Sequence, residues 1–339
     1  MTKACQYQRA CMSSHLVFRV ALLLSAGLSA PGCSFILPST PHSTTSERSC
    51  APLRPTVFHV QGDELSVDTY ETDLPLSEQS IEVAKVMNVL PLLSQLTALQ
   101  RAGETHSIAF MELRQSLTDQ LLLTLFELSS ITAELVCERD RADQVADRMD
   151  EIDASMVKRL TLASIVISGI AGIVSGGIGL AGGATNASDA AGLSGGLVAS
   201  VFGGTALFAT SKQEFRHERN LLNEVWQNPK QSSVFSPAIR RFLHQRHNKD
   251  QAVTTREEVI RAWRQQGRLG EPGSTGEQER TALMFGPGGT YASTDLRARA
   301  SMLETLEAHI NLLSEELEVF LREIIQQRIQ RTPQEGSLS

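Results

Sequence analysis

Aromatic residues are scarce in this chain, because Phe, Trp and Tyr together make up only 5% of its 339 residues. Sheet sandwiches and barrels are rich in aromatic and β-branched residues, whereas this chain contains long runs of Leu, Ala, Ser, Glu, Gln and Arg. The composition therefore predicts an all-α protein. We expect an elongated helical bundle or coiled coil that brackets a hydrophobic, glycine-rich helical hairpin.

A large net charge and metal-binding motifs are also missing. The formal charge is −7, which gives no reason to expect nucleic acid as a partner. The sequence contains no C-x-x-C and no H-E-x-x-H, so we expect no metal and no cofactor. Cys5 and Cys11 precede the body of the protein. A disulfide between Cys50 and Cys137 would be permitted in the cell envelope, but we expect free thiols.

The N-terminus reads as an export signal at residues 1–33, with Met1 or Met12 as the start. Residues 20–28 form an apolar stretch that is too short for a comfortable transmembrane helix. The small residues before Cys33 resemble the lipobox of bacterial lipoproteins, which implies lipidation of Cys33. Ala30 and Pro31 depart from that pattern, so an uncleaved anchor or a misassigned start codon stays open. A Ser/Thr/Pro-rich tether follows at residues 34–76, with short strands between residues 56 and 70.

Two long helices with heptad patterns are predicted on either side of the chain's centre. The first belongs to a helical arm at residues 77–159, in which Pro91 interrupts an early helix. The second covers residues 293–331, and its apolar seam needs a partner, for which the first long helix is the simplest candidate. The seam positions are Leu121, Leu128, Leu135, Ala142, Met149 and Met156, with Ile131, Val145 and Ile152, in the first helix, and Leu303, Leu306, Ile310, Leu313, Leu317, Phe320 and Ile324 in the second.

The hydrophobic hairpin is predicted at residues 160–211. Charged residues are absent from 29 residues after Arg159 and from 22 residues after Asp189, and each run can supply the roughly 20 residues of a membrane-spanning helix. Small residues recur at every fourth position in both halves. Such lines let helix backbones approach closely in lipid, so we expect contact with a bilayer and self-association. The alternative is a buried apolar hairpin in a soluble bundle. The packing positions are Ser168, Gly172, Gly176, Gly179, Gly183, Gly192, Gly196, Ser200 and Gly204.

Two enzyme motifs occur by letter inside this hairpin. Residues 177–182 match the dinucleotide-binding G-x-G-x-x-G, but no βαβ unit is predicted around them. Residues 192–196 match the G-x-S-x-G of serine hydrolases, but their flanks are Ala and Gly instead of a buried strand. We therefore expect a non-enzymatic protein.

Basic helices are predicted at residues 212–266, followed by a Gly/Pro-rich loop at residues 267–292. From Lys212 to Arg264 the net charge is +5, whereas from Glu112 to Asp153 it is −7. We expect these two segments to pack together, and the alternative is that the basic one meets anionic headgroups. The candidate headgroup contacts, for which a solvated face is the simpler interpretation, are Arg240, Arg241, Arg246 and Lys249.

The basic flanks of the hairpin conflict with an export signal. Lys158 and Arg159 precede the hairpin, and Lys212, Arg216 and Arg219 follow it, so the positive-inside rule places both flanks in the cytoplasm. Export places them outside. Either the N-terminal interpretation is wrong, or the hairpin enters a membrane after export.

The layout of residues 78–331 resembles the α-helical pore-forming toxins of the haemolysin E type. In those toxins long helices bracket a sheltered hydrophobic hairpin that inserts into a target membrane. The resemblance is one of layout and involves no specific motif. We expect a resident lipoprotein or scaffold of the bacterial envelope, whose helices bind partner proteins, with a pore-forming toxin as the alternative.

Overall fold

The computed structural model describes residue 50 and residues 74–180, 210–217, 219–246 and 253–331. The chain divides into the units Met1–Arg48 and Ser49–Ser339, and every described residue lies in the second. This described part contains eight helices and one small sheet, which confirms the all-α class. The predicted signal, Cys33, and the tether up to residue 73, apart from Cys50, lie outside the described residues.

Two short helices open the described part of the chain. Helix α2 (Glu78–Val86) begins after Ser77, whose hydroxyl accepts a hydrogen bond from the Ser80 N–H. It ends at Val86, and Asn88 two residues later adopts a left-handed conformation with φ of 57°. Pro91 then lies in the first turn of α3 (Leu90–Arg101), where the missing N–H costs no helical hydrogen bond. Pro91 therefore starts a new helix and does not kink an old one.

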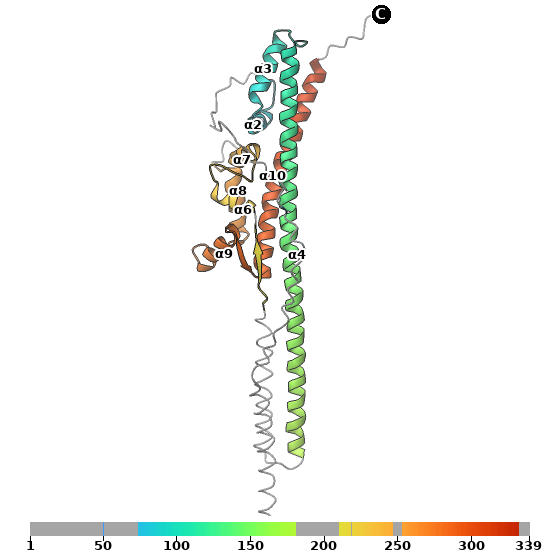
Figure 1. Ribbon diagram of the computed structural model, residues 1–339, viewed down its shortest axis with the longest axis vertical. Coiled ribbons are helices and arrows are strands. Elements are labelled where there is room, and N and C mark those ends of the chain that lie inside the picture. Colours follow the sequence, from blue (N-terminus) through green and yellow to red (C-terminus); the bar gives the residue numbers. More distant parts are fainter. Residues whose placement is uncertain (1–49, 51–73, 181–209, 218, 247–252, 332–339) are drawn as a thin grey trace, which may run out of the picture. The chain divides into compact units, whose positions relative to one another are not determined.

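The predicted pairing of the two heptad helices is confirmed. Helix α4 (Ile108–Leu180) runs beside α10 (Ser293–Arg331), and Figure 1 shows them lying along one another. The central seam residues of both helices are buried, including Leu135 and Leu313 with no exposed surface. The seam ends toward the hairpin, where Ile152 is 48% exposed.

Four short helices fill the space beside α4 and α10. They are α6 (Leu221–Gln227), α7 (Pro237–His244), α8 (Thr255–Gln265) and α9 (Thr275–Phe285). Trp263 of α8 is fully buried, and its indole N–H donates to the Met302 carbonyl of α10 at 3.0 Å. This hydrogen bond satisfies the polar end of a large core side chain and fixes α8 on α10. A Thr254–Glu257 capping box begins α8.

Two predictions for the region between the long helices are wrong. Residues 213–216 form strand β1 instead of the start of a helix, and the expected loop contains α9 and strand β2 (Gly288–Tyr291). The strands pair antiparallel, with Phe215 opposite Gly289. Gly288 allows this pairing, because its φ is +115° and a Cβ there would collide with the Phe215 carbonyl. A strand of four residues is too short to show a periodic pattern, and its partner strand lies about 75 residues away. The strand therefore could not be predicted from its local sequence.

Cys50 and Cys137 form a disulfide with their Cα atoms 5.7 Å apart. The expectation of free thiols was therefore wrong. Sequence spacing could not reveal the pair, because 87 residues separate the two cysteines. The bond fixes residue 50 to the middle of α4.

The oppositely charged segments pack together, as predicted. Arg219 approaches Glu134 of α4 at 3.5 Å. Burial raises the pKa of the Glu127 carboxyl, and the nearby positive charge of Arg241 offsets part of that rise. Glu134 is 5% exposed, and burial raises its pKa to about 7. Glu127 and Glu134 of α4 thus lie against the basic segment, whereas Asp140 and Asp147 farther along α4 remain exposed.

Candidate membrane-contacting segment

The two ends of the predicted hairpin meet at one place on the body. The Ser211 N–H donates to Asp153 Oδ1 at 2.8 Å, and the Ser211 hydroxyl donates to the Met149 carbonyl at 3.4 Å. We call this contact the root. The chain therefore leaves the body along α4 at Asp153 and returns to α4 at Ser211, which is the connectivity that a hairpin requires.

The described outgoing leg is an unbroken continuation of α4. Figure 1 shows α4 running past the β1–β2 sheet and past the start of α10. The 21 residues from Leu160 to Leu180 contain no charged side chain. At 1.5 Å per residue they extend for about 30 Å, which matches the thickness of a bilayer's hydrocarbon core.

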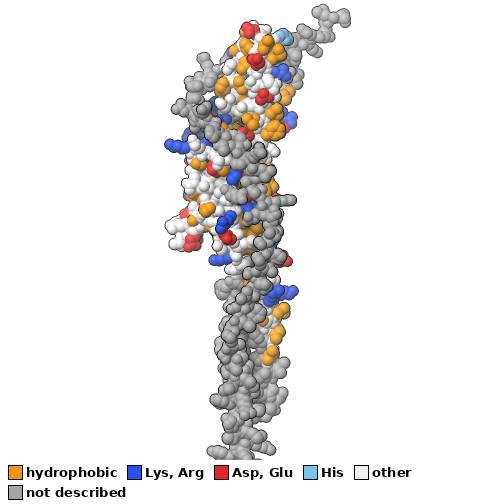
Figure 2. Space-filling model, viewed as in Figure 1, with side chains coloured by type: hydrophobic (Ala, Val, Ile, Leu, Met, Phe, Trp, Pro, Cys, Tyr) orange, Lys and Arg blue, Asp and Glu red, His pale blue; other side chains and the backbone are white. Residues whose placement is uncertain are grey.

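Large apolar side chains on this leg are exposed. Leu162, Ile165, Val166 and Ile170 have 54–61% of their surface accessible. Figure 2 shows hydrophobic side chains following α4 below basic ones. By length and composition α4 is the one described helix that could cross a membrane, a criterion that a soluble core helix also passes. Its exposed end, however, is unlike a core helix, because a contiguous apolar surface is a common mark of a contact site.

Three hydroxyl groups in the first half of the leg have partners inside the helix. Thr161 donates to the Val157 carbonyl, Ser164 to the Thr161 carbonyl and Ser168 to the Ser164 carbonyl, all at 2.8 Å. Such back-bonding is also found at Thr118 and Thr124 in the body, so it is not specific to this leg. It nevertheless meets a requirement of lipid, where an unpaired polar group costs several kcal/mol.

Basic side chains surround the root. Lys158, Arg159 and Lys212 are exposed, and within the described residues no ion pair engages them. The acidic groups on the body side are instead bound, because Arg297 of α10 contacts both Asp147 and Asp150, at 2.8 and 2.6 Å. Hydrogen bonds from Ser293 and Arg297 lower the pKa of Asp150. Cations that lack an acidic partner thus lie between the body and the apolar leg.

The structure describes only some of the small residues that were predicted as packing positions. Ser168 is exposed on α4, and the backbone of Gly172, Gly176 and Gly179 is helical. The remaining packing positions, Gly183, Gly192, Gly196, Ser200 and Gly204, lie outside the described residues. The self-association that these positions predict therefore stays a prediction. The residues Gly177–Leu180 of the dinucleotide-like motif continue α4, so they form no phosphate-binding turn.

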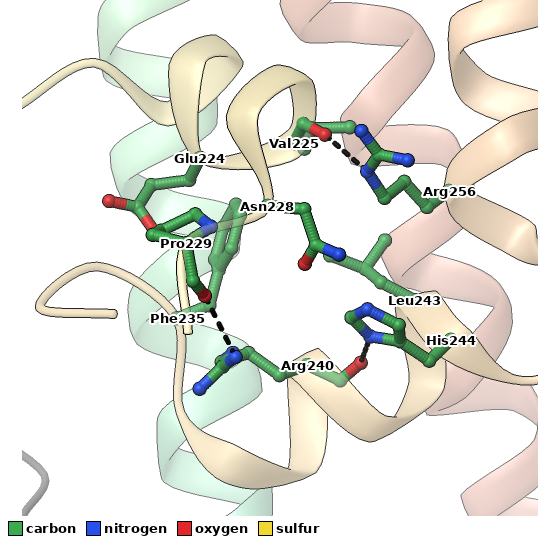
Figure 3. A pocket seen from close by; sticks show the side chains of 9 residues that line it. All are labelled: Glu224, Val225, Asn228, Pro229, Phe235, Arg240, Leu243, His244 and Arg256. Atoms are coloured by element: carbon green, nitrogen blue, oxygen red, sulfur yellow. Dashed lines mark hydrogen bonds between the residues drawn. The ribbon is translucent and has the colours of Figure 1, made fainter. Parts of the chain in front are cut away.

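The candidate headgroup arginines make contacts within the protein. Arg240 donates to the Pro229 carbonyl at 2.9 Å, beside Arg256, which donates to the Val225 carbonyl at 2.6 Å (Figure 3). Both guanidinium groups thereby neutralise the end of α6. The cavity between them has about 10 Å³ of free space, which admits no more than a water molecule.

Arg241 is likewise engaged, because it donates to the Val86 carbonyl at 2.6 Å. Arg246 is exposed, and Lys249 lies outside the described residues. These contacts give the basic α7 a structural role in joining α2, α6 and α8.

In the described residues no group of three or more His, Cys, Asp or Glu side chains could hold a metal ion.

His217, Tyr291 and Arg299 form a buried polar cluster that could not be found from the sequence. His217 follows β1 and is 6% exposed, and its Nε2 lies 2.9 Å from the hydroxyl of Tyr291. Arg299 of α10 is completely buried and donates to the Met284 carbonyl at 3.1 Å. Burial, reinforced by Arg299 and Arg141, lowers the pKa of His217 to about 3. No motif marks these residues, because they meet only when β1 pairs with β2.

Comparisons of the chain with protein-family models, with curated proteins and with solved structures find no match. The resemblance to pore-forming toxins therefore rests on the layout of helices and hairpin alone.

Proposed function

We propose that the protein is a non-enzymatic, membrane-associated protein of the bacterial envelope whose hairpin enters a bilayer and self-associates there. The observation that supports this proposal most directly is the outgoing leg, which presents Leu162, Ile165 and Ile170 to solvent in the first half of a charge-free segment about 30 Å long. In water this surface is unfavourable, and in lipid it is matched by its surroundings.

The root is also suited to a membrane surface. Lys158, Arg159 and Lys212 lie next to the apolar leg and are free to meet lipid phosphates. The opposite side of the root belongs to the folded body, where Arg297 binds Asp147 and Asp150. The leg would therefore be immersed up to this level while the body remains in water.

The Cys50–Cys137 disulfide is consistent with a location outside the cytoplasm, because disulfides persist in oxidising compartments. It accords with the proposed export signal at residues 1–33 and with lipidation at Cys33. In this scheme the basic flanks do not determine topology, since the hairpin enters the membrane after export.

Membrane entry is tested with the protein expressed in bacteria from its full reading frame. After fractionation, membranes are washed with alkaline carbonate, which removes proteins that are bound only at the surface. We expect the protein to stay with the membranes. Complete release into the carbonate supernatant would contradict insertion of the hairpin.

Self-association is tested by replacing Gly172 and Gly196 with Leu, a change that prevents close approach of helix backbones. We expect chemical crosslinking in detergent to give oligomers for the wild type and monomers for the variant, with an unchanged helical signal by circular dichroism. Oligomers of the same size in both would refute the packing role of these glycines.

A pore-forming toxin is the second candidate, and the unbroken course of α4 from the body into the leg favours it. Such a continuous helix can extend from a water-soluble body directly into a target membrane. Purified protein that lacks the residues before Ser34 is added to dye-loaded liposomes. Dye release would favour the pore, whereas its absence together with lipid labelling of Cys33 would favour the resident lipoprotein.

A further inference from the structure

The returning chain of the hairpin is held to the body by residues 213–217, which we call the strap. The strap consists of β1, which pairs with β2, and of His217, whose N–H donates to the Pro287 carbonyl at 3.2 Å. Arg141 of α4 reinforces it, since its guanidinium lies 4.3 Å from the centre of the Phe215 ring and donates to the Arg216 carbonyl at 2.7 Å. The strap follows the root by two residues, so it holds the chain where the chain re-enters the body.

His217 is the titratable side chain of the strap that is buried. Its ring packs against Phe215 of β1 and Tyr291 of β2, with ring centres 5.6 and 5.8 Å apart. The Tyr291 hydroxyl donates to the Leu283 carbonyl of α9 at 2.8 Å, so His217 Nε2–H donates to the Tyr291 oxygen. His217 Nδ1 is buried without a hydrogen-bond partner.

The charges that face His217 oppose a proton on its ring. Arg299 of α10 and Arg141 of α4 both act on the imidazole as nearby positive charges. Among the described residues, Glu138 of α4 acts on Arg299, and it is bound to Arg141 at 3.1 Å. Asn220, before α6, contributes an amide oxygen 3.4 Å from Arg299 Nη1. A protonated His217 would therefore be a second buried cation beside Arg299, and no carboxylate of the described residues is paired with it.

We propose that the strap is an acid-sensitive latch, in which protonation of His217 releases residues 213–217 from β2 and from Arg141 of α4. The latch regulates the membrane entry proposed above and rests on that function. It gives the protein a paired strap at neutral pH and a released one in an acidic medium.

The size of the effect follows from proton linkage. Burial lowers the pKa of His217 to about 3 in the closed strap, whereas a released imidazole has its ordinary value of 6.5. With these two pKa values, lowering the pH from 7 to 5 increases the ratio of released to closed strap about 25-fold. Glu134 does not cancel this change, because its partner Arg219 also donates to the Ser233 and Val234 carbonyls and stays in the body when the strap leaves.

The latch is tested by hydrogen exchange of the full chain in solution, followed by mass spectrometry at pH 7 and pH 5 after correction for intrinsic exchange rates. We expect protection of the β1 amides to fall about 25-fold at pH 5, while the core amides of α10 stay protected. In His217→Gln, which keeps a neutral donor for Tyr291, the β1 protection should not change with pH. His309→Gln, a half-buried histidine of α10, is the matched control and should behave as the wild type.

Equal protection of β1 in the wild type at both pH values would overturn the latch, and this result needs no variant. The same conclusion follows if His217→Gln keeps the full pH response. Binding of the full chain to liposomes at both pH values separates the latch from the membrane function. If the strap opens at pH 5 but the chain enters liposomes equally at pH 7 and pH 5, only the regulation of membrane entry by the latch is overturned. An opened strap without entry at either pH overturns the proposed function and leaves the latch intact.

Discussion

A single lysine at the centre of the outgoing leg provides the sharpest test of membrane entry. Ile170 lies ten residues beyond Leu160, which places it about 15 Å along the leg and close to the midplane of a hydrocarbon core about 30 Å thick. It is 58% exposed in the protein as it stands. Ile170→Lys therefore changes the cost of entering lipid while leaving the fold in water nearly unaffected.

The expected magnitude comes from the transfer of one side chain to the bilayer centre. Isoleucine favours that position by about 0.5 kcal/mol and lysine opposes it by about 3 kcal/mol. The difference of about 3 to 4 kcal/mol lowers the equilibrium constant for membrane insertion by roughly 150- to 700-fold. Snorkelling of the lysine toward the headgroups reduces this value, most strongly for a leg that tilts.

The assay compares flotation with liposomes for the wild type, Ile170→Lys and the control Ile325→Lys. Ile325 is 54% exposed on α10, so its substitution adds the same charge at a similar exposure on the body instead of the leg. We expect loss of flotation for Ile170→Lys only. Wild-type flotation of Ile170→Lys, with an unchanged thermal unfolding curve, would show that this leg is not immersed in lipid.

Three further predictions concern stability. Replacing Cys50 and Cys137 with Ser should lower the free energy of urea unfolding by about 3 to 5 kcal/mol, because the bond closes a loop with a sequence separation of 87 residues; an unchanged midpoint would contradict a formed disulfide. Leu313→Ala should cost about 2 to 5 kcal/mol in the same assay, since Leu313 is fully buried in the α4–α10 seam; a cost below 1 kcal/mol would contradict that packing. Burial raises the pKa of Glu134 to about 7 in the folded state, so its contribution to stability is complete below its unfolded pKa of 4.5 and is lost as the pH rises through 7. Glu134→Gln should therefore reduce the fall in unfolding free energy between pH 5 and pH 8, and an identical pH profile would refute this assignment.

The helical frame could be predicted from the sequence because helix periodicity is local. The heptads at Leu303, Ile310 and Leu317 predict a helix over residues 293–331, and α10 has those bounds. The charge-free run after Arg159 likewise predicts that α4 continues without a stop, and it continues to Leu180. In both cases the residues that decide the conformation are close neighbours along the chain.

The strap and the disulfide depend on partners far along the chain. Phe215 is buried because Gly288 lets β2 approach it closely, and that contact overrides the helical pattern expected for residues 212–226. Cys50 is bonded to Cys137 of α4 across a sequence separation of 87. Arg240 and Arg241 were candidates for lipid contact until the fold supplied carbonyl partners for them.

The sequence by itself determined the α class, the two seam helices and the apolar, charge-free leg, since each follows from spacing within one segment. Tertiary structure decided that Ser211 meets Asp153 at the root, and it enclosed His217 between Arg141 and Arg299. These contacts join residues that are 58 to 82 positions apart. The pairing of such distant groups is set by how the helices and strands pack, and no local pattern encodes it.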